Sequence, residues 1–112
     1  MIDVTVYVNS EHRYTGIAMT GHAGRADQPV EGQDLVCAAA SALTLNMANS
    51  VERFTEDPFQ ADVEEDGGDF RFRFTDKPGE AASLLMNSLV LGLEDLADAY
   101  GEPYIKIRFE EV

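Results

Sequence analysis

Residues 34–54 read DLVCAAASALTLNMANSVERF, and this stretch decides the fold class because the hydrophobic period changes here. On both sides of it apolar residues alternate with polar ones, whereas within it they recur every three or four residues. We therefore predict a long helix from Asp34 to Phe54, with one buried face and with Asp34 as the N-cap that accepts the N–H of Cys37. The residues expected on that buried face are Val36, Ala40, Leu43, Met47, Val51 and Phe54.

Two hairpins are predicted around this helix, because alternating segments occur in pairs separated by turn residues. The first turn covers Asn9 to His12, and the second is the stretch Glu65-Asp66-Gly67-Gly68, whose Asp-Gly-Gly core is a strong hairpin signal. Arg71 and Arg73 are expected to face acidic residues of the neighbouring strand. The predicted strands cover residues 2–8, 13–20, 59–64 and 70–74.

A second helix and a last strand complete the chain. Pro78 and Gly79 open the helix and Gly101 and Pro103 end it, as is typical of helix boundaries. The order β-β-α-β-β-α-β over residues 1–112 predicts a single α+β domain, a two-layer sandwich with both helices on one face of a mostly antiparallel sheet. The buried residues expected here are Ala82, Leu85, Leu89, Leu93, Leu96 and Tyr100 in the helix, and Ile105, Ile107 and Phe109 in the strand.

The charged residues limit the classes of partner that the chain can bind. The net charge is −13, from 21 acidic residues against 8 Lys plus Arg. Such a field repels phosphate backbones, which argues against direct binding of nucleic acid, and attracts basic proteins. No apolar run is long enough to span a membrane, and the first residues lack the pattern of a signal peptide. A lone cysteine fits a reduced, cytoplasmic setting.

Cys37 is that single cysteine, and it is expected in the first helical turn, off the main apolar face. Backbone N–H groups and the helix dipole favour an anion there, which suits a thiolate nucleophile. His22 follows the second predicted strand and can serve as its base. The alternative is that Cys37 fills a gap in the core and that His22 is an ordinary surface residue. The residue pattern alone leaves both interpretations open.

Two further polar residues adjoin this pair. Asp34 is first a helix cap and second a residue that could orient His22. Ser41 lies one turn beyond Cys37, where it can hydrogen-bond into a site or to its own helix. One cysteine and two histidines without regular spacing predict no metal site, and no cofactor is expected. His12 is assigned no chemistry.

The chain resembles the bacterial ribosomal-processing cysteine protease family, called Prp. The resemblance extends over essentially the whole chain, including the element order and the sequence LVLGLE at residues 89–94. It implies a homodimeric cysteine endopeptidase that removes a short N-terminal extension from a bacterial large-subunit ribosomal protein, number twenty-seven. Such a substrate is basic, in keeping with the acidic composition. The motifs that carry the resemblance are Gly21-His22-Ala23 and Gly32-x-Asp34-Leu35-Val36-Cys37-Ala38-Ala39-x-Ser41.

The resemblance also implies roles for residues. Cys37 would be the nucleophile and His22 the general base and acid, with Asp34 and Ser41 in support. Gly21 would allow the chain to pass closely beside His22. The loop from Ala23 to Gln33 would close over a bound peptide. The candidates for the oxyanion hole are the backbone N–H groups of Val36 and Ala38.

Two other functions are compatible with the residues. One is a noncatalytic ribosome-assembly module, in which the acidic surface binds a basic ribosomal protein and Cys37 belongs to the core. The other is a redox sensor, which would need an intermolecular partner because the chain has no second cysteine.

Overall fold

The structure, a computed structural model, describes residues 1–21, 32–64 and 69–112. The observed order β-β-α-β-β-α-β is the predicted one, and the expected turn at residues 65–68 lies outside the described residues. Gly101 follows the second helix with a positive φ of 62°, which agrees with the predicted stop. The elements are β1 (Ile2–Val8), β2 (Tyr14–Thr20), α1 (Gln33–Phe54), β3 (Phe59–Val63), β4 (Phe70–Phe74), α2 (Glu80–Tyr100) and β5 (Ile105–Glu111).

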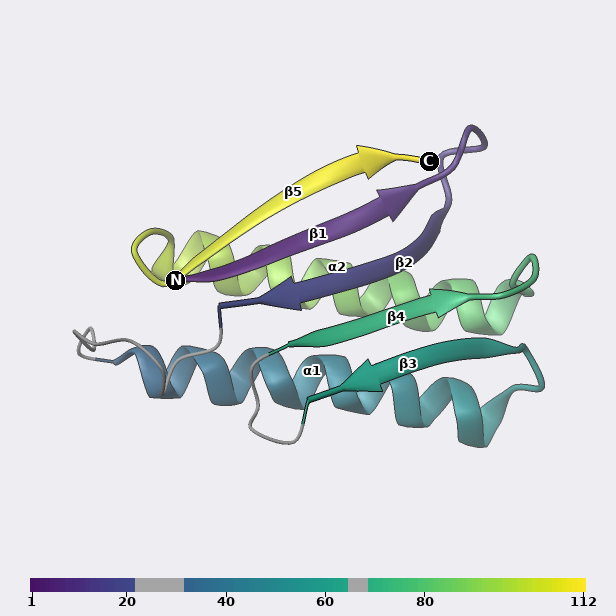
Figure 1. Ribbon diagram of the computed structural model, residues 1–112, viewed down its shortest axis with the longest axis horizontal. Helices are drawn as coiled ribbons and strands as arrows, with labels where there is room; N and C mark the ends of the chain where they lie inside the picture. Colours follow the sequence, from purple (N-terminus) through teal and green to yellow (C-terminus); the bar gives the residue numbers. More distant parts are fainter. Residues whose placement is uncertain (22–31, 65–68) are drawn as a thin grey trace.

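The five strands form one sheet in the order β3-β4-β2-β1-β5. All neighbouring strands are antiparallel except β1 and β5, which are parallel. Figure 1 shows both helices on the same side of this sheet. The two-layer α+β sandwich with a mostly antiparallel sheet is therefore confirmed. The parallel pairing of β5 with β1 follows from α2, which carries the chain back across the sheet.

The hydrophobic core lies between the sheet and the helices. Phe72 of β4, Val51 of α1 and Leu93 of α2 are each at most 2% exposed. Three residues predicted to be buried are instead exposed, namely Phe54, Tyr100 and Phe109. The first two end their helices, and Phe109 is on the edge strand β5, so each has the right period but lacks an element to cover it.

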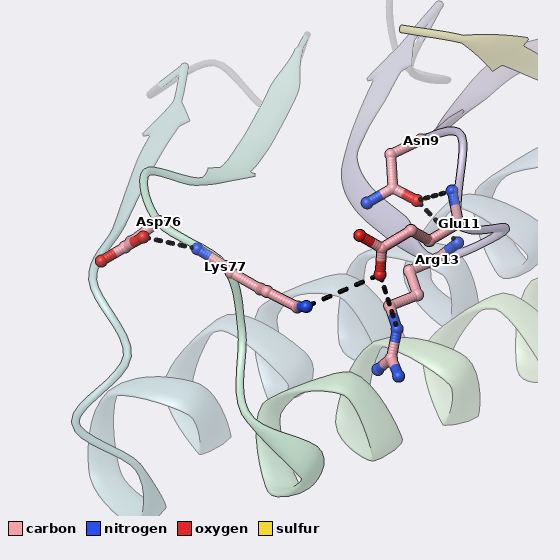
Figure 2. A network of polar contacts seen from close by, with 5 residues as sticks. All are labelled: Asn9, Glu11, Arg13, Asp76 and Lys77. Carbon is pink, nitrogen blue, oxygen red and sulfur yellow. Dashed lines mark hydrogen bonds and ion pairs between the residues drawn. The ribbon is translucent and has the colours of Figure 1, made fainter.

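A polar network closes the end of the molecule where β1 turns into β2 (Figure 2). The Asn9 side-chain oxygen accepts the backbone N–H groups of Glu11 and Arg13 at 2.9 and 3.0 Å. Lys77, which precedes α2, reaches the Glu11 carboxylate at 3.6 Å. These groups are exposed, so the ion pair contributes little to stability. The network fixes the hairpin turn rather than forming a site.

The face of the sheet opposite the helices is open and carries four of the eight Lys and Arg residues. They are Arg71 and Arg73 on β4 and Lys106 and Arg108 on β5. Arg73 donates to Gln60 Oε1 at 2.8 Å, and Arg71 is paired in register with Asp62. The expected acidic neighbour is present for Arg71, whereas the prediction is wrong for Arg73, whose neighbour is an amide. Neither described helix combines the length and the hydropathy needed to cross a membrane.

Candidate active site

Cys37 lies in the second turn of α1, not in the first turn as predicted. The helix begins at Gln33, one residue earlier than expected, and its N-cap is Gly32 with a φ of +86°. Glycine adopts this left-handed conformation without the strain that a Cβ atom adds, so Gly32 sets the start of the helix. Gln33, which the sequence pattern placed in the loop, is consequently part of the helix.

Asp34 is not the helix cap. No described side chain makes a capping hydrogen bond at Gly32, and Asp34 is exposed in the first turn. Its carboxylate still lies near the positive end of the helix dipole, where it stabilises the helix. The prediction failed because it relied on the residue type of Asp34, which is common at helix caps. The backbone conformation of Gly32 decides where this helix starts.

The Cys37 side chain is buried, with 3% of its surface exposed. The prediction that it lies off the apolar face is wrong, because it belongs to the same core as Val36 and Ala40. The helix buries more than a narrow face, since α1 packs against both the sheet and α2. Gln33 Nε2 donates to Cys37 Sγ at 3.6 Å. The same nitrogen donates to the carbonyl oxygen of Tyr104 at 3.2 Å.

Gln33 and Tyr104 are functional candidates that the sequence pattern missed. A start of the helix at Gln33 places this residue four positions before Cys37, which is one turn away. That spacing is visible in the sequence once the helix boundary is known. Tyr104 is far away in the chain, so no local pattern indicates its contact with α1.

His22 lies outside the described residues, and so does most of the loop from Ala23 to Gln33. The residues that flank this segment are described and lie at one end of the molecule, where β2 ends and α1 begins (Figure 1). A Cβ built on Gly21 would clash with the Met1 carbonyl oxygen, whereas one on Gly32 would be 3.6 Å from the Tyr104 hydroxyl. Ile2 follows Met1 in the chain, and its N–H donates to the Tyr104 carbonyl oxygen at 2.8 Å.

These contacts link Gly21 to Cys37 through a short series of neighbours. Gly21 packs against Met1 and Ile2, Ile2 bonds to Tyr104, and Tyr104 accepts the amide of Gln33. The residue immediately before His22 is thereby held at the same end of the fold as the sulfur. A cysteine thiol supplied with a base performs nucleophilic acyl transfer, so this end of the fold is the candidate active site.

We expect replacement of Gly21 by alanine to lower the free energy of unfolding by about 3 kcal/mol. Gly21 has a φ of +79°, and the added methyl group would clash with the Met1 carbonyl. Gly32→Ala is the matched control, since its φ of +86° is also positive but its Cβ would meet only ordinary contact at 3.6 Å. Its expected cost is about 1 kcal/mol. Urea unfolding measures both, and equal losses would contradict the clash.

The remaining candidates lie on α1. Ser41 is half-buried, and its carbonyl oxygen accepts the Thr44 hydroxyl at 3.1 Å. The Val36 N–H donates to the Gly32 carbonyl oxygen at 3.3 Å, and Ala38 is exposed within the helix. The Val36 donor is therefore engaged by the turn that starts the helix.

A shallow depression of ≈ 560 Å³ lies on the open face of the sheet, lined by Tyr7, Gly16, Arg71 and Arg73 among others. Cys37 is not among its lining residues, because the thiol lies on the helix side of the sheet. Two arginines beside it also make this face unsuitable for a basic peptide. The depression is not the candidate active site.

The chain as a whole is similar to known proteins. Residues 1–106 match the family model described as Cysteine protease Prp. The ribosomal processing cysteine protease Prp of Staphylococcus aureus (strain Mu50 / ATCC 700699) is 30% identical over 102 residues, which cover 91% of this chain and 93% of that protein. The protein of the same name from Bacillus subtilis (strain 168) is 32% identical over 104 residues, with 89% and 90% covered.

Solved structures are similar along their full length. The crystal structure of an essential ribosomal processing protease Prp from S. aureus in complex with a substrate peptide superposes with a TM-score of 0.88 at 29% identity, covering 98% of this chain and 100% of that one. The S. aureus protease with a covalently linked product peptide gives a TM-score of 0.84 with the same coverage and identity.

Proposed function

Because the chain belongs to the Prp family of cysteine proteases, we propose that it is an endopeptidase in which Cys37 and His22 form a catalytic dyad. The observation that carries the proposal is the position of the only cysteine. Cys37 lies near the start of α1, at the end of the fold where Gly21 holds the chain just before His22. The covalently linked product peptide in the S. aureus relative is consistent with a nucleophilic mechanism there.

The proposed reaction has two stages, which are acylation of Cys37 and hydrolysis of the resulting thioester. His22 takes the proton of Cys37, and Sγ attacks the scissile carbonyl carbon to form a tetrahedral intermediate. His22 then returns the proton to the leaving amine nitrogen as the C–N bond breaks, which leaves a thioester on Cys37. Water activated by His22 hydrolyses the thioester, releases the second product as a carboxylic acid and restores the thiol.

The first step needs access to a buried atom. Only 3% of Cys37 is exposed, so the groups that cover Sγ must move when a peptide binds. The oxyanion would be stabilised by backbone N–H groups around Val36 and Ala38. Use of Val36 requires its N–H to leave the Gly32 carbonyl, and at 3.3 Å that bond is long and weak. Ser41, one turn beyond Cys37, and Asp34, in the exposed first turn, would support the dyad.

The proposed substrate is a bacterial large-subunit ribosomal protein, number twenty-seven, that carries an N-terminal extension. Both relatives compared above are named ribosomal processing proteases, and one is solved with a substrate peptide. A net charge of −13 favours a basic protein substrate over nucleic acid. A cytoplasmic location is part of this proposal, because the proposed substrate is a ribosomal protein.

The proposed assembly is a homodimer. Leu84 and Leu91 on α2 are exposed by 68% and 60%, and their spacing of seven residues puts them on one face of the helix. A second copy could cover this face. Sedimentation velocity at micromolar concentration should then give the mass of a dimer, and a monomer under those conditions would contradict the proposal.

The noncatalytic alternative has one observation in its favour, which is that Cys37 belongs to the hydrophobic core. In that case the protein would bind the basic ribosomal protein without cleaving it. The test is incubation of the purified protein with that ribosomal protein carrying its extension, followed by mass spectrometry. Two fragments that sum to the substrate plus one water support the endopeptidase. Binding without fragments supports the module.

A further inference from the structure

Gln33 makes an unusual set of contacts for a buried amide. Its side chain is almost fully buried, since the residue is 4% exposed. The nitrogen donates to Cys37 Sγ and to the Tyr104 carbonyl oxygen, whereas Oε1 has no partner among the described residues. Buried polar atoms are normally hydrogen-bonded, and exceptions often mark functional positions. Gln33 therefore acts here as a donor only.

The orientation of this amide is determined by Tyr104. A carbonyl oxygen can only accept, so the Gln33 nitrogen must face it, because the flipped amide would bring two oxygens together. The Tyr104 backbone is itself held on both sides. Its carbonyl also accepts the Ile2 N–H at 2.8 Å, and its N–H donates to the Gly101 carbonyl at 2.9 Å. The donor that points at Sγ is thus anchored to β1 and to the turn after α2.

The Gln33 amide N–H is the donor in this contact and Cys37 Sγ is the acceptor. A thiol sulfur is a weak acceptor, whereas hydrogen bonds to an ionised group are about twice as strong as neutral ones. The contact also restrains Sγ to the side of α1 that faces Tyr104. The side chain keeps both donor contacts even though Oε1 has no hydrogen-bond partner among the described residues.

We propose that Gln33 is a positioning residue for the nucleophile, holding Cys37 Sγ by an amide hydrogen bond that the Tyr104 carbonyl orients. This role rests on the proposed function, because it has meaning only if Cys37 reacts. Gln33 acts through Cys37 and is not assigned a contact with the substrate.

Gln33→Met tests the role, because methionine has a similar length and no N–H donor. We expect alkylation of Cys37 by iodoacetamide at pH 7, in which Sγ bonds to carbon as iodide leaves, to slow by about 10-fold. Peptide cleavage should lose a similar factor in kcat with little change in KM, since the lost contact is to the nucleophile. The melting temperature should change by less than about 5 °C, because the substitution also removes Oε1, which no described residue bonds.

Gln33→Glu provides a second readout. Glutamate has the same shape, but burial favours its protonated form, whose single O–H would bond the Tyr104 carbonyl and leave Sγ without this donor, so alkylation should be as slow as in Gln33→Met. Ser83→Ala is the matched control. Its hydroxyl is the other buried side-chain oxygen without a partner among the described residues, and it lies near the start of α2, at the end opposite Cys37. Its alkylation and cleavage rates should equal those of the wild type.

Equal alkylation rates in the wild type and Gln33→Met, including equally undetectable ones, would overturn the role of Gln33. So would a lower melting temperature with unchanged alkylation, which indicates a purely structural contact. These outcomes do not depend on proteolysis. Failure of the wild-type protein to cleave the ribosomal substrate while Gln33 still controls alkylation would instead reject the proposed function and leave the Gln33–Cys37 coupling intact.

Discussion

Replacement of Cys37 by alanine or serine is expected to abolish cleavage of the extended ribosomal protein, with a loss of about 10⁴-fold or more in kcat/KM. Neither side chain can form the thioester efficiently, because alanine has no nucleophile and serine lacks the easily ionised sulfur. The measurement is single-turnover cleavage followed by mass spectrometry. Cleavage by both variants at the wild-type rate would reject Cys37 as the nucleophile.

Stability must be measured beside activity because Cys37 is part of the core. Cys37→Ala leaves only a small cavity and should cost about 1–2 kcal/mol of the free energy of unfolding. Met47→Leu is a suitable control, since Met47 is also buried on α1 and the substitution nearly conserves volume. It should retain full activity with a similar small change in stability. A Cys37→Ala protein that is folded, binds the substrate and does not cleave it separates chemistry from packing.

Replacement of His22 by asparagine is expected to reduce cleavage by about 10²–10⁴-fold, the usual contribution of a general base and acid. Asparagine can hydrogen-bond but cannot carry a proton between Cys37 and the leaving amine. The alkylation of Cys37 by iodoacetamide should also slow, because the same residue removes the thiol proton. Both rates are measured at pH 7 on the full chain.

The chain contains its own matched control for this experiment. His12 is the other histidine, and it lies exposed in the β1–β2 turn with a φ of +63°. Asparagine tolerates this left-handed conformation, so His12→Asn should preserve both the turn and the activity. An equal loss in the two variants, or no loss in His22→Asn, would contradict the dyad.

Much of the fold could be predicted because the hydrophobic periods differ between its parts. The alternation of Val4 and Val6 with polar residues and the helical spacing of Val36, Ala40 and Met47 report directly which side of each element is buried. The failures occurred where burial depends on the neighbours. Phe54 continues the apolar spacing of α1 but is 72% exposed, since the helix extends past its cover.

At the candidate site, the start of α1 also differs from what local residue preference predicts. Aspartate is a common helix cap, so local preference alone predicts that the helix starts at Asp34. The positive φ of Gly32 instead starts it at Gln33. The shift of one residue moves Cys37 into the second turn and brings Gln33 within hydrogen-bonding distance of its sulfur. No propensity argument could have supplied that contact, because it also requires the Tyr104 carbonyl.

The sequence by itself determined the element order, the α+β class and the identity of the only thiol, because these depend on period and composition along the chain. Tertiary structure decided the strand order, the burial of Cys37 and its link to Gln33 and Tyr104. Gln33 and Tyr104 are 71 residues apart, and only the packing of α1 against the start of β5 brings them together. Local periodicity carries no information on such distant pairs, because it reports only which side of an element is apolar.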